Sequence, residues 1–326
     1  MKNIYLQIDE EIRKANTIGV ISHMSPDGDA IGSTTALYEI LDFNFPSKKI
    51  NVINLDDVPG NLVFLPNAEK ITKDFSINDF DLIITVDIGA FKLNGFGEDK
   101  EIVFKDKMLI NIDHHLTNEF YGNINLVDIS KPSTTSVLYD FFVAMEYKIN
   151  KNAALCLLTG IYTDTGSFIY SNVTPDTFTI SSELMNIGGD PTIINDEFFS
   201  NNSFEFLKLY SIVLDRFTLK DNVGISYIKK EDLEECNCIH NELGIVVSKL
   251  NQVEGIDYVC FLSEKGNMVK GSLRTYKEDV DLTKIAKRYN GGGHKKASAF
   301  TIEGKIKIED GKIAVEKTNG EIIYFT

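Results

Sequence analysis

The stretch TIGVISHMSPDGDAIGS, residues 17–33, joins a short apolar run to a second apolar segment through a polar turn. The run at 17–22 predicts a buried β-strand, and the pattern after the turn predicts a helix over residues 30–43. Pro26 and Gly28 lie in the turn, where they are typical of a connecting loop. The stretch therefore predicts one strand–turn–helix unit.

Three further apolar runs extend this pattern through the first half of the chain. They are KINVINL at 49–55, DLIITVD at 81–87 and KMLINID at 107–113. Short buried strands that alternate with helical patterns are typical of a parallel sheet covered by helices on both faces. We therefore expect an α/β fold. Further helices are expected at 134–147, at 153–162, and from Thr174 to Gly188.

The length of 326 residues is too great for one core of ordinary size, so two domains are expected. The first should span residues 1–200. An amphipathic helical pattern within 201–218 predicts a linker helix. Strand-like runs and short helices beyond it predict a smaller α/β domain over residues 219–326.

Composition limits the classes of partner. A net charge of −15 argues against binding to long DNA or RNA, because such binding relies on many basic contacts to phosphates. No run approaches the length of a membrane helix, and the charged N-terminus resembles no secretory leader, so we expect a cytoplasmic protein without a membrane partner. The four cysteines suggest reduced thiols; a C-x-C-x-H cluster at 236–240 is a weaker zinc alternative.

Acidic and histidine side chains follow three of the predicted strands and one helix. The set is His23, Asp27, Asp29, Asp87, Asp113, His114, His115 and Asp164. The carboxyl ends of parallel strands face one crevice, so these side chains should meet there. Each segment alone also fits an ordinary reading: Asp29 as a helix N-cap, Asp87 as a turn residue, and residues 113–115 as a polar turn.

Four carboxylates and two imidazoles, those of His23, Asp27, Asp29, Asp87, His114 and Asp164, suit two divalent ions with one bridging carboxylate. Because the set lacks thiolates, manganese or magnesium is favoured over structural zinc. Two such ions can activate a water and neutralise the charge that builds on a phosphoryl group.

The combination of H-x-x-x-D-x-D at 23–29, Asp87, D-H-H at 113–115, Asp164 and G-G-G-H at 291–294 resembles the DHH phosphoesterase superfamily with its DHH-associated C-terminal domain. Within it, the group of nanoRNases and pAp phosphatases is the best match. The resemblance implies a two-manganese centre. One ion would be held by His23, Asp27 and Asp87, and the other by Asp29, Asp87, His114 and Asp164.

The same resemblance gives roles to the other two residues of the D-H-H motif. Asp113 would orient the turn from behind the metal ligands, and His115 would meet the scissile phosphate. In the second domain, the resemblance implies substrate binding by Arg274, Gly291, Gly292, Gly293 and His294. This segment is basic, with eight basic and three acidic side chains from Lys270 to Lys296, although a glycine run is also a common turn after a helix.

Two features depart from the family pattern. Phe300 stands where the family tends to have a small residue, and the tail after it predicts extra short strands that close a sheet edge. The expected function is a manganese-dependent phosphoesterase that hydrolyses short oligoribonucleotides, linear dinucleotides and 3′-phosphoadenosine 5′-phosphate (pAp) to mononucleotides. The N-terminal domain would supply hydroxide and the C-terminal domain would anchor the substrate across a cleft. A homodimer is expected, because related proteins often dimerise.

Three alternatives stay open at this point. The first is a cyclic di-AMP phosphodiesterase, which would use the same metal ligands. The second is a manganese-type inorganic pyrophosphatase, although G-G-G-H argues against it. The third is a nucleotide-binding regulator without catalysis. Substrate preference, cleavage polarity and oligomeric state are not fixed by the sequence.

Overall fold

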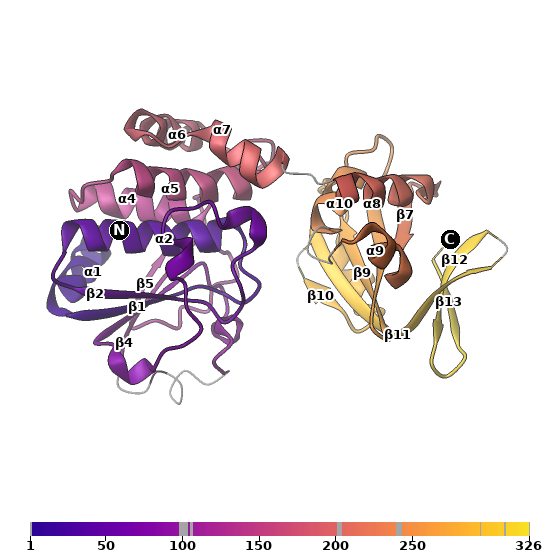
Figure 1. Cartoon of the computed structure of the whole chain (residues 1–326), viewed down its shortest axis with the longest axis horizontal. Coiled ribbons are helices and arrows are strands. Elements are labelled where there is room, and N and C mark those ends of the chain that lie inside the picture. The colour runs from indigo at the N-terminus through magenta and orange to yellow at the C-terminus, as the bar shows by residue number, and fades with distance from the viewer. Residues whose placement is uncertain are drawn as a thin grey trace. The chain divides into compact units, whose positions relative to one another are not determined.

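The computed structural model describes residues 2–97, 104, 107–200, 204–238, 243–293, 295–309 and 311–325. The chain forms two compact units, Met1–Asn201 and Asn202–Thr326 (Figure 1). Among the described residues, no helix is long and apolar enough to cross a membrane.

The first unit is built on a sheet of five parallel strands. They are β1 Thr17–Ile21, β2 Lys49–Ile53, β3 Leu82–Val86, β4 Met108–Asp113 and β5 Ile124–Val127, in the order β2-β1-β3-β4-β5. The chain direction across the sheet reverses between β1 and β3. In open parallel sheets such a reversal leaves a crevice at the carboxyl ends of the strands, where ligands bind.

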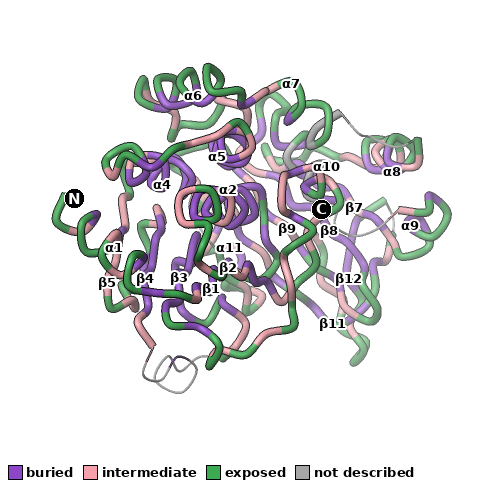
Figure 2. Tube along the Cα trace, turned by 60° about the vertical axis from the view of Figure 1, so that its left-hand side comes forward, coloured by how far each residue is buried: buried purple, intermediate pink, exposed green. Residues whose placement is uncertain are grey.

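Helices cover one face of this sheet. They are α1 Lys2–Lys14, α2 Gly28–Asn44, α4 Thr134–Ala144, α5 Lys151–Asp164, α6 Pro175–Ile187 and α7 Pro191–Ile194, followed by a π-helical turn at Asn195–Ser200. Alternate strand residues such as Ile18 and Val20 pack into their core. Figure 2 shows buried residues along α2 and the central strands.

The other face of the sheet has a smaller core, which includes Ile21, Ile83 and Phe91. Among the described residues it is covered by loops and by two short 3-10 helices, Ile77–Asp79 and Phe91–Asn94. Further 3-10 turns lie at Gly60–Leu62 and Ala68–Lys70. The predicted α/β fold with a parallel sheet is confirmed, with its long helices gathered on one side.

Two helix starts show how the sequence sets the local structure. α2 begins at Gly28 because the Asp27 carboxylate accepts hydrogen bonds from the N–H groups of Asp29 and Ala30, both at 3.1 Å. The N-cap is therefore Asp27, and the ordinary reading of Asp29 as the cap is wrong. α6 begins as expected after Thr174, with Pro175 in its first turn, and ends at Gly188.

Helices α2 and α5 pack closely enough to require glycine. A Cβ on Gly32 would lie 2.7 Å from the carbonyl oxygen of Cys156, and one on Gly160 would lie 2.5 Å from Oδ1 of Asp29. Cys156, Leu157 and the rest of the α5 centre are fully buried, as the sequence predicts. This contact brings the first turn of α2 near the last turn of α5.

The second unit contains a larger, mixed sheet. Its strands are β6 Thr218–Lys220, β7 Val223–Ile228, β8 Tyr258–Lys265, β9 Met268–Arg274, β10 Gly292–Gly293, β11 Ala297–Glu309, β12 Lys312–Lys317 and β13 Ile322–Tyr324. The order is β13-β12-β11-β9-β8-β7-β6, with β10 paired to β11. β7 and β8 are parallel, and the other pairs are antiparallel.

Helices pack on both faces of this second sheet. α8 Phe204–Asp215, α9 Lys230–Cys236 and α10 Leu243–Leu250 cover one core, and α11 Leu282–Lys287 joins the other. The helix expected to be a linker is α8, and its Leu209 and Val213 are buried in the core of the second unit. The C-x-C-x-H cluster ends in His240, which lies outside the described residues.

The tail after Phe300 forms strands, as predicted. It lengthens β11 and adds β12 and β13 in antiparallel pairing, so it extends the sheet beyond β11.

Candidate metal centre

The loop after β1 supplies two side chains to the crevice between β1 and β3. Nδ1 of His23 lies 2.8 Å from the carbonyl oxygen of Met24. A neutral imidazole that donates this hydrogen bond leaves Nε2 free as a ligand, and Nε2 lies 3.4 Å from Oδ2 of Asp87 and 3.9 Å from Oδ1 of Asp27. The carboxylate of Asp27 therefore caps α2 and also faces the crevice.

Asp29 is fully buried and is held by the start of another helix. It accepts hydrogen bonds from the backbone N–H groups of Thr134 at 2.6 Å and Thr135 at 3.0 Å, and from the Thr135 hydroxyl at 2.8 Å. The first turn of α4 thus acts as an anion site for this carboxylate. Burial raises the pKa of Asp29, and the nearby charge of Asp27 adds to the rise.

Asp87 follows β3 in a left-handed backbone conformation, with a φ of 59°. This conformation is unusual for a residue other than glycine, and it aims the carboxylate into the crevice. The backbone N–H donates to the carbonyl of Ile112, and Oδ1 accepts a hydrogen bond of 3.0 Å from the hydroxyl of Thr134. Burial raises the pKa of Asp87 well above its ordinary value, and the charge of Asp29 raises it further.

At the end of β4, Asp113 is fully buried and points away from the crevice, toward its own supporting residues. Its Oδ1 accepts from Nδ1 of His115 at 2.7 Å, and its Oδ2 accepts from Nδ2 of Asn118 at 2.6 Å. Burial is the largest influence on the pKa of Asp113 and raises it, but the hydrogen bonds from His115 and Asn118 and the charges of the two histidines together lower the pKa below the ordinary value. An ionised Asp113 fixes the proton of His115 on Nδ1 and leaves its Nε2 available.

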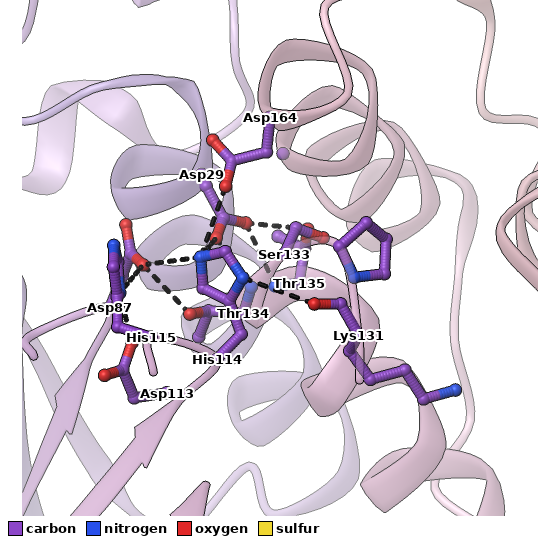
Figure 3. Close-up of polar contacts among 12 residues, drawn as sticks. Asp29, Asp87, Asp113, His114, His115, Lys131, Ser133, Thr134, Thr135 and Asp164 are labelled. Atoms are coloured by element: carbon purple, nitrogen blue, oxygen red, sulfur yellow. Dashed lines mark hydrogen bonds and ion pairs between the residues drawn. The ribbon is translucent and has the colours of Figure 1, made fainter. Parts of the chain in front are cut away.

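His114 lies at the centre of the buried acids (Figure 3). Its Nε2 lies 3.3 Å from Oδ2 of Asp164, 3.8 Å from Oδ1 of Asp87 and 3.9 Å from Oδ2 of Asp29, yet it makes no hydrogen bond with suitable geometry to any described residue. Burial by itself lowers the pKa of His114, but the contact with Asp164 and the surrounding charges raise it to about 10. Burial and the charge of Asp29 raise the pKa of Asp164 to about 7.

Three overlapping groups of side chains have ligand atoms within 4.8 Å of one another. They are His23, Asp27 and Asp87; Asp29, His114 and Asp164; and Asp87, His114 and His115. Asp87 and His114 each belong to two of the groups, and Asp87 is the carboxylate of the two, as expected of a bridging ligand. The eight residues that the sequence predicts for this centre, His23, Asp27, Asp29, Asp87, Asp113, His114, His115 and Asp164, therefore lie together in the first unit.

The donor set fits divalent cations. Buried carboxylates repel one another, and a buried imidazole nitrogen without a hydrogen bond costs free energy unless something binds it. A cation among Asp29, His114 and Asp164 would remove both penalties, and oxygen and imidazole ligands suit manganese. Burial and geometry therefore favour a metal-binding role over a structural ion-pair network.

Three residues that support the centre were missed by sequence reasoning. Thr134 and Thr135 hold the buried acids, and Asn118 holds Asp113. The run STTS at 133–136, with Ser133 as the observed N-cap of α4, was the available signal for a helix start that could bind an anion. Asn118 had no comparable signal.

The predicted substrate residues lie in the second unit. Arg274 ends β9, and its Nη1 donates to the carbonyl of Leu273 at 2.9 Å. Gly292 and Gly293 form β10 and pair with Ala299 and Ser298 of β11. A Cβ on Gly291 would lie 2.2 Å from the carbonyl oxygen of Ala299, so close packing against β11 requires a glycine there.

His294, the last of the predicted substrate residues, lies outside the described residues.

Comparisons with known proteins agree with this geometry. The sequence profile of the DHH family, N-terminal domain, matches residues 17–161, and that of the DHHA1 domain matches residues 221–321. The probable bifunctional oligoribonuclease and PAP phosphatase NrnA of Streptococcus mutans is 29% identical, over 92% of this chain and 94% of the relative. The bifunctional oligoribonuclease and PAP phosphatase NrnA of Bacillus subtilis is 28% identical, over 88% and 90%.

A solved structure shows the same fold along almost the whole chain. An exopolyphosphatase-related protein from Bacteroides fragilis superposes with a TM-score of 0.86 at 28% identity, over 92% of this chain and 91% of that one. The two domain matches together cover most of the sequence, and each lies within one of the two structural units. The chain therefore belongs to the DHH family of phosphoesterases, with a DHHA1 domain as its second unit, and is a hydrolase that acts on phosphate ester bonds.

Proposed function

We propose that this chain hydrolyses short oligoribonucleotides, linear dinucleotides and pAp to mononucleotides, as an exonuclease of the nanoRNase and pAp phosphatase type that depends on two manganese ions. The observation that carries the proposal is the cluster of acids and histidines around the buried Asp87, which belongs to two potential ligand groups. The names of the two NrnA relatives, which align over most of their length, support the substrate class.

The two ions would be held by overlapping ligand sets. His23, Asp27 and Asp87 form one potential ligand group and would bind one ion. Asp29, His114 and Asp164 form another and would bind the second ion, with Asp87 as the shared ligand, because Oδ1 of Asp87 lies 3.8 Å from Nε2 of His114. When bound, such ions lower the pKa of a coordinated water and offset the charge that develops on the phosphoryl group. The raised pKa values of Asp29, Asp87 and Asp164 come first from burial and then from neighbouring negative charge, and a bound cation would offset both.

The chain's own residues would position the substrate and move a proton. His115 has a side chain that is 37% exposed, compared with 14% for His114, so it can more readily reach a ligand in the crevice. Its Nδ1 proton is fixed by Asp113, which leaves Nε2 to hydrogen-bond a substrate oxygen or to exchange a proton with it. In the second unit, Arg274, the backbone of Gly291 to Gly293, and His294 would bind a terminal phosphate of the substrate.

Short substrates are proposed rather than long nucleic acid, since the net charge of −15 disfavours extended contact with a phosphate backbone. All four cysteines are free thiols, which supports the proposed cytoplasmic location. A homodimer stays a prediction, and sedimentation velocity would test it.

The test is a panel of substrates assayed with manganese: pAp, a linear dinucleotide, a cyclic dinucleotide and inorganic pyrophosphate. We expect turnover of the first two. Asp87→Asn should abolish it, because the shared ligand is lost. Asp57→Asn should not, since Asp57 is an exposed carboxylate paired only with Lys73 in the described part of the chain.

Faster turnover of the cyclic dinucleotide or of pyrophosphate would replace the proposed substrate class. Wild-type protein that binds nucleotide but turns over nothing on the panel would refute the proposal.

A further inference from the structure

The second unit contains a pocket that the phosphoesterase centre does not use. Its volume is about 240 Å³, and all of its lining residues lie between 220 and 325. The floor is apolar and comes from β7, β8 and β9, as in Ile225, Cys260 and Leu273. One side is formed by the end of α11 and the residue after it, and another by the end of the chain at Tyr324 and Phe325.

This pocket lies on the opposite face of the sheet from Arg274. Leu273 pairs with Cys260, and both belong to the core on the pocket side. Arg274 pairs with Val259, which belongs to the core on the other side. Successive residues of a strand point to opposite faces, so the side chain of Arg274 cannot line this pocket. The pocket is therefore separate from the proposed substrate-binding residue.

One wall consists of three aromatic rings. The rings of Phe300 and Phe325 stack with an interplanar angle of 2° and centroids 5.9 Å apart, and Tyr289 lies 4.5 Å from Phe300. Phe300, the residue that departs from the family pattern, pairs with Gly271, where a Cβ would lie 2.1 Å from the ring. The glycine thus makes room for this aromatic wall. Phe325 lies beyond the segment that matches the DHHA1 domain.

The rim of the pocket is cationic. Arg288 and Lys220 both line it, and neither side chain forms a hydrogen bond or an ion pair with any residue that the structure describes. Asp221 is the acidic neighbour on the same rim. Tyr258 also lines the pocket; burial, followed by the neighbouring Cys260, raises its pKa, and the charge of Arg288 opposes this rise because the two side chains lie near each other. Two cations beside an apolar and aromatic interior favour an anion attached to a flat ring.

We propose that this pocket binds a planar aromatic ring that carries a phosphate, which is the chemistry of a nucleoside monophosphate. The volume lies just below the range of 300–1,000 Å³ that is typical of sites for drug-sized ligands, so it fits one ring system with the phosphate at the rim. The base stacks on the aromatic wall, as bases commonly do on aromatic side chains. Arg288 and Lys220 bind the phosphate, and the Asp221 carboxylate can accept from an exocyclic amine.

The test measures binding without turnover. AMP is titrated by calorimetry into the full chain in EDTA, so the result does not depend on the phosphoesterase activity. Adenosine and inorganic phosphate are the probes for each half of the ligand. We expect AMP to bind more tightly than either half. Arg288→Ala should weaken AMP binding by about tenfold or more, because one charge-assisted hydrogen bond is lost.

Two variants provide matched controls. Lys287→Ala removes one positive charge from the adjacent, exposed position of α11, which does not line the pocket. Arg274→Ala removes the proposed substrate contact on the other face and shows whether AMP binds there instead. Lys287→Ala should keep AMP binding within about twofold of wild type. Arg288→Ala should fold normally, because its side chain is exposed.

Three outcomes would overturn the proposal. The first is the absence of AMP binding to the wild-type chain. The second is AMP binding that Arg274→Ala abolishes and Arg288→Ala leaves intact, which would place the nucleotide on the other face. The third is a change of oligomeric state with Arg288→Ala in sedimentation velocity, which would identify the pocket as part of an interface between two copies.

Discussion

Asn118 holds the Asp113 carboxylate that orients His115, and this arrangement can be tested by placing a second carboxyl beside Asp113. Asn118 donates from Nδ2 to Oδ2 of Asp113 at 2.6 Å, and both residues are buried, at 8% and 0% exposure. Asn118→Asp preserves the shape of the side chain but replaces the donor with a carboxyl. That carboxyl can keep the hydrogen bond only while it is protonated.

The repulsion between the two carboxylates can be estimated from the distance between them. Two charges about 4 Å apart interact with about 4 kcal/mol at an effective dielectric constant of 20. That free energy corresponds to a pKa raised by about 3 units for the introduced carboxyl, since one unit is about 1.4 kcal/mol. Its folded pKa then exceeds its unfolded pKa, so the folded state holds the extra proton, and stability falls as the pH rises from about 4 to about 7.

The assay compares urea unfolding of Asn118→Asp and wild type at each pH in EDTA. The contribution of the other acids to the unfolding free energy is the same in both proteins, so it largely cancels in the difference. We expect the loss of unfolding free energy to be about 1.5 kcal/mol near pH 5 and to reach about 4 kcal/mol near pH 8. With manganese, the turnover number should fall over the same pH range, because Asp113 no longer orients His115. Asn78→Asp, an exposed position, controls for the added charge.

A difference in unfolding free energy that stays constant from pH 5 to pH 8 would refute this reasoning, as would a variant as stable as wild type near pH 8. Either result would mean that Asp113 and Asn118 do not share a buried hydrogen bond.

Three further predictions concern the metal centre. Thr134→Val, which removes the hydroxyl that bonds Asp87, should weaken manganese binding by about tenfold in a calorimetric titration without unfolding the chain; unchanged affinity would argue against this support. Gly160→Ala should lower the melting temperature and the metal affinity together, because its Cβ would lie 2.5 Å from Asp29. In EDTA, the melting temperature should fall as the pH rises from about 5 to 9, since Asp164 and its acidic neighbours have raised folded pKa values, and manganese should reverse the trend.

The strands and helices of the first unit were predictable where the signal was local. β1, β3 and β4 are short apolar runs bounded by polar turns, and both faces of the sheet are buried, so continuous apolar sequence marks them. β5 was missed because it is short and only one of its four residues is buried. The order of the strands was also out of reach, since it depends on which runs pair in three dimensions.

The residues of the candidate site also fall into those that the sequence could predict and those that it could not. The acids and histidines stood out because they follow strands whose ends meet at one edge of the sheet. The hydroxyl of Thr134 and the amide of Asn118 did not, because each is an ordinary polar residue until its partner is known. Thr134 bonds a carboxylate 47 residues away in the chain, and such a pairing leaves no local pattern.

The packing of α2 against α5 has a consequence for metal preference. Asp29 lies in the first turn of α2 and Asp164 ends α5, so two donors of one candidate ion are attached to different helices that touch through Gly32 and the carbonyl of Cys156. The distance between the carboxylates of Asp29 and Asp164 therefore depends on how closely α2 and α5 approach each other. A larger residue at Gly32 would push the two helices apart and increase this distance. The site would then favour a larger cation, although every ligand would still be present.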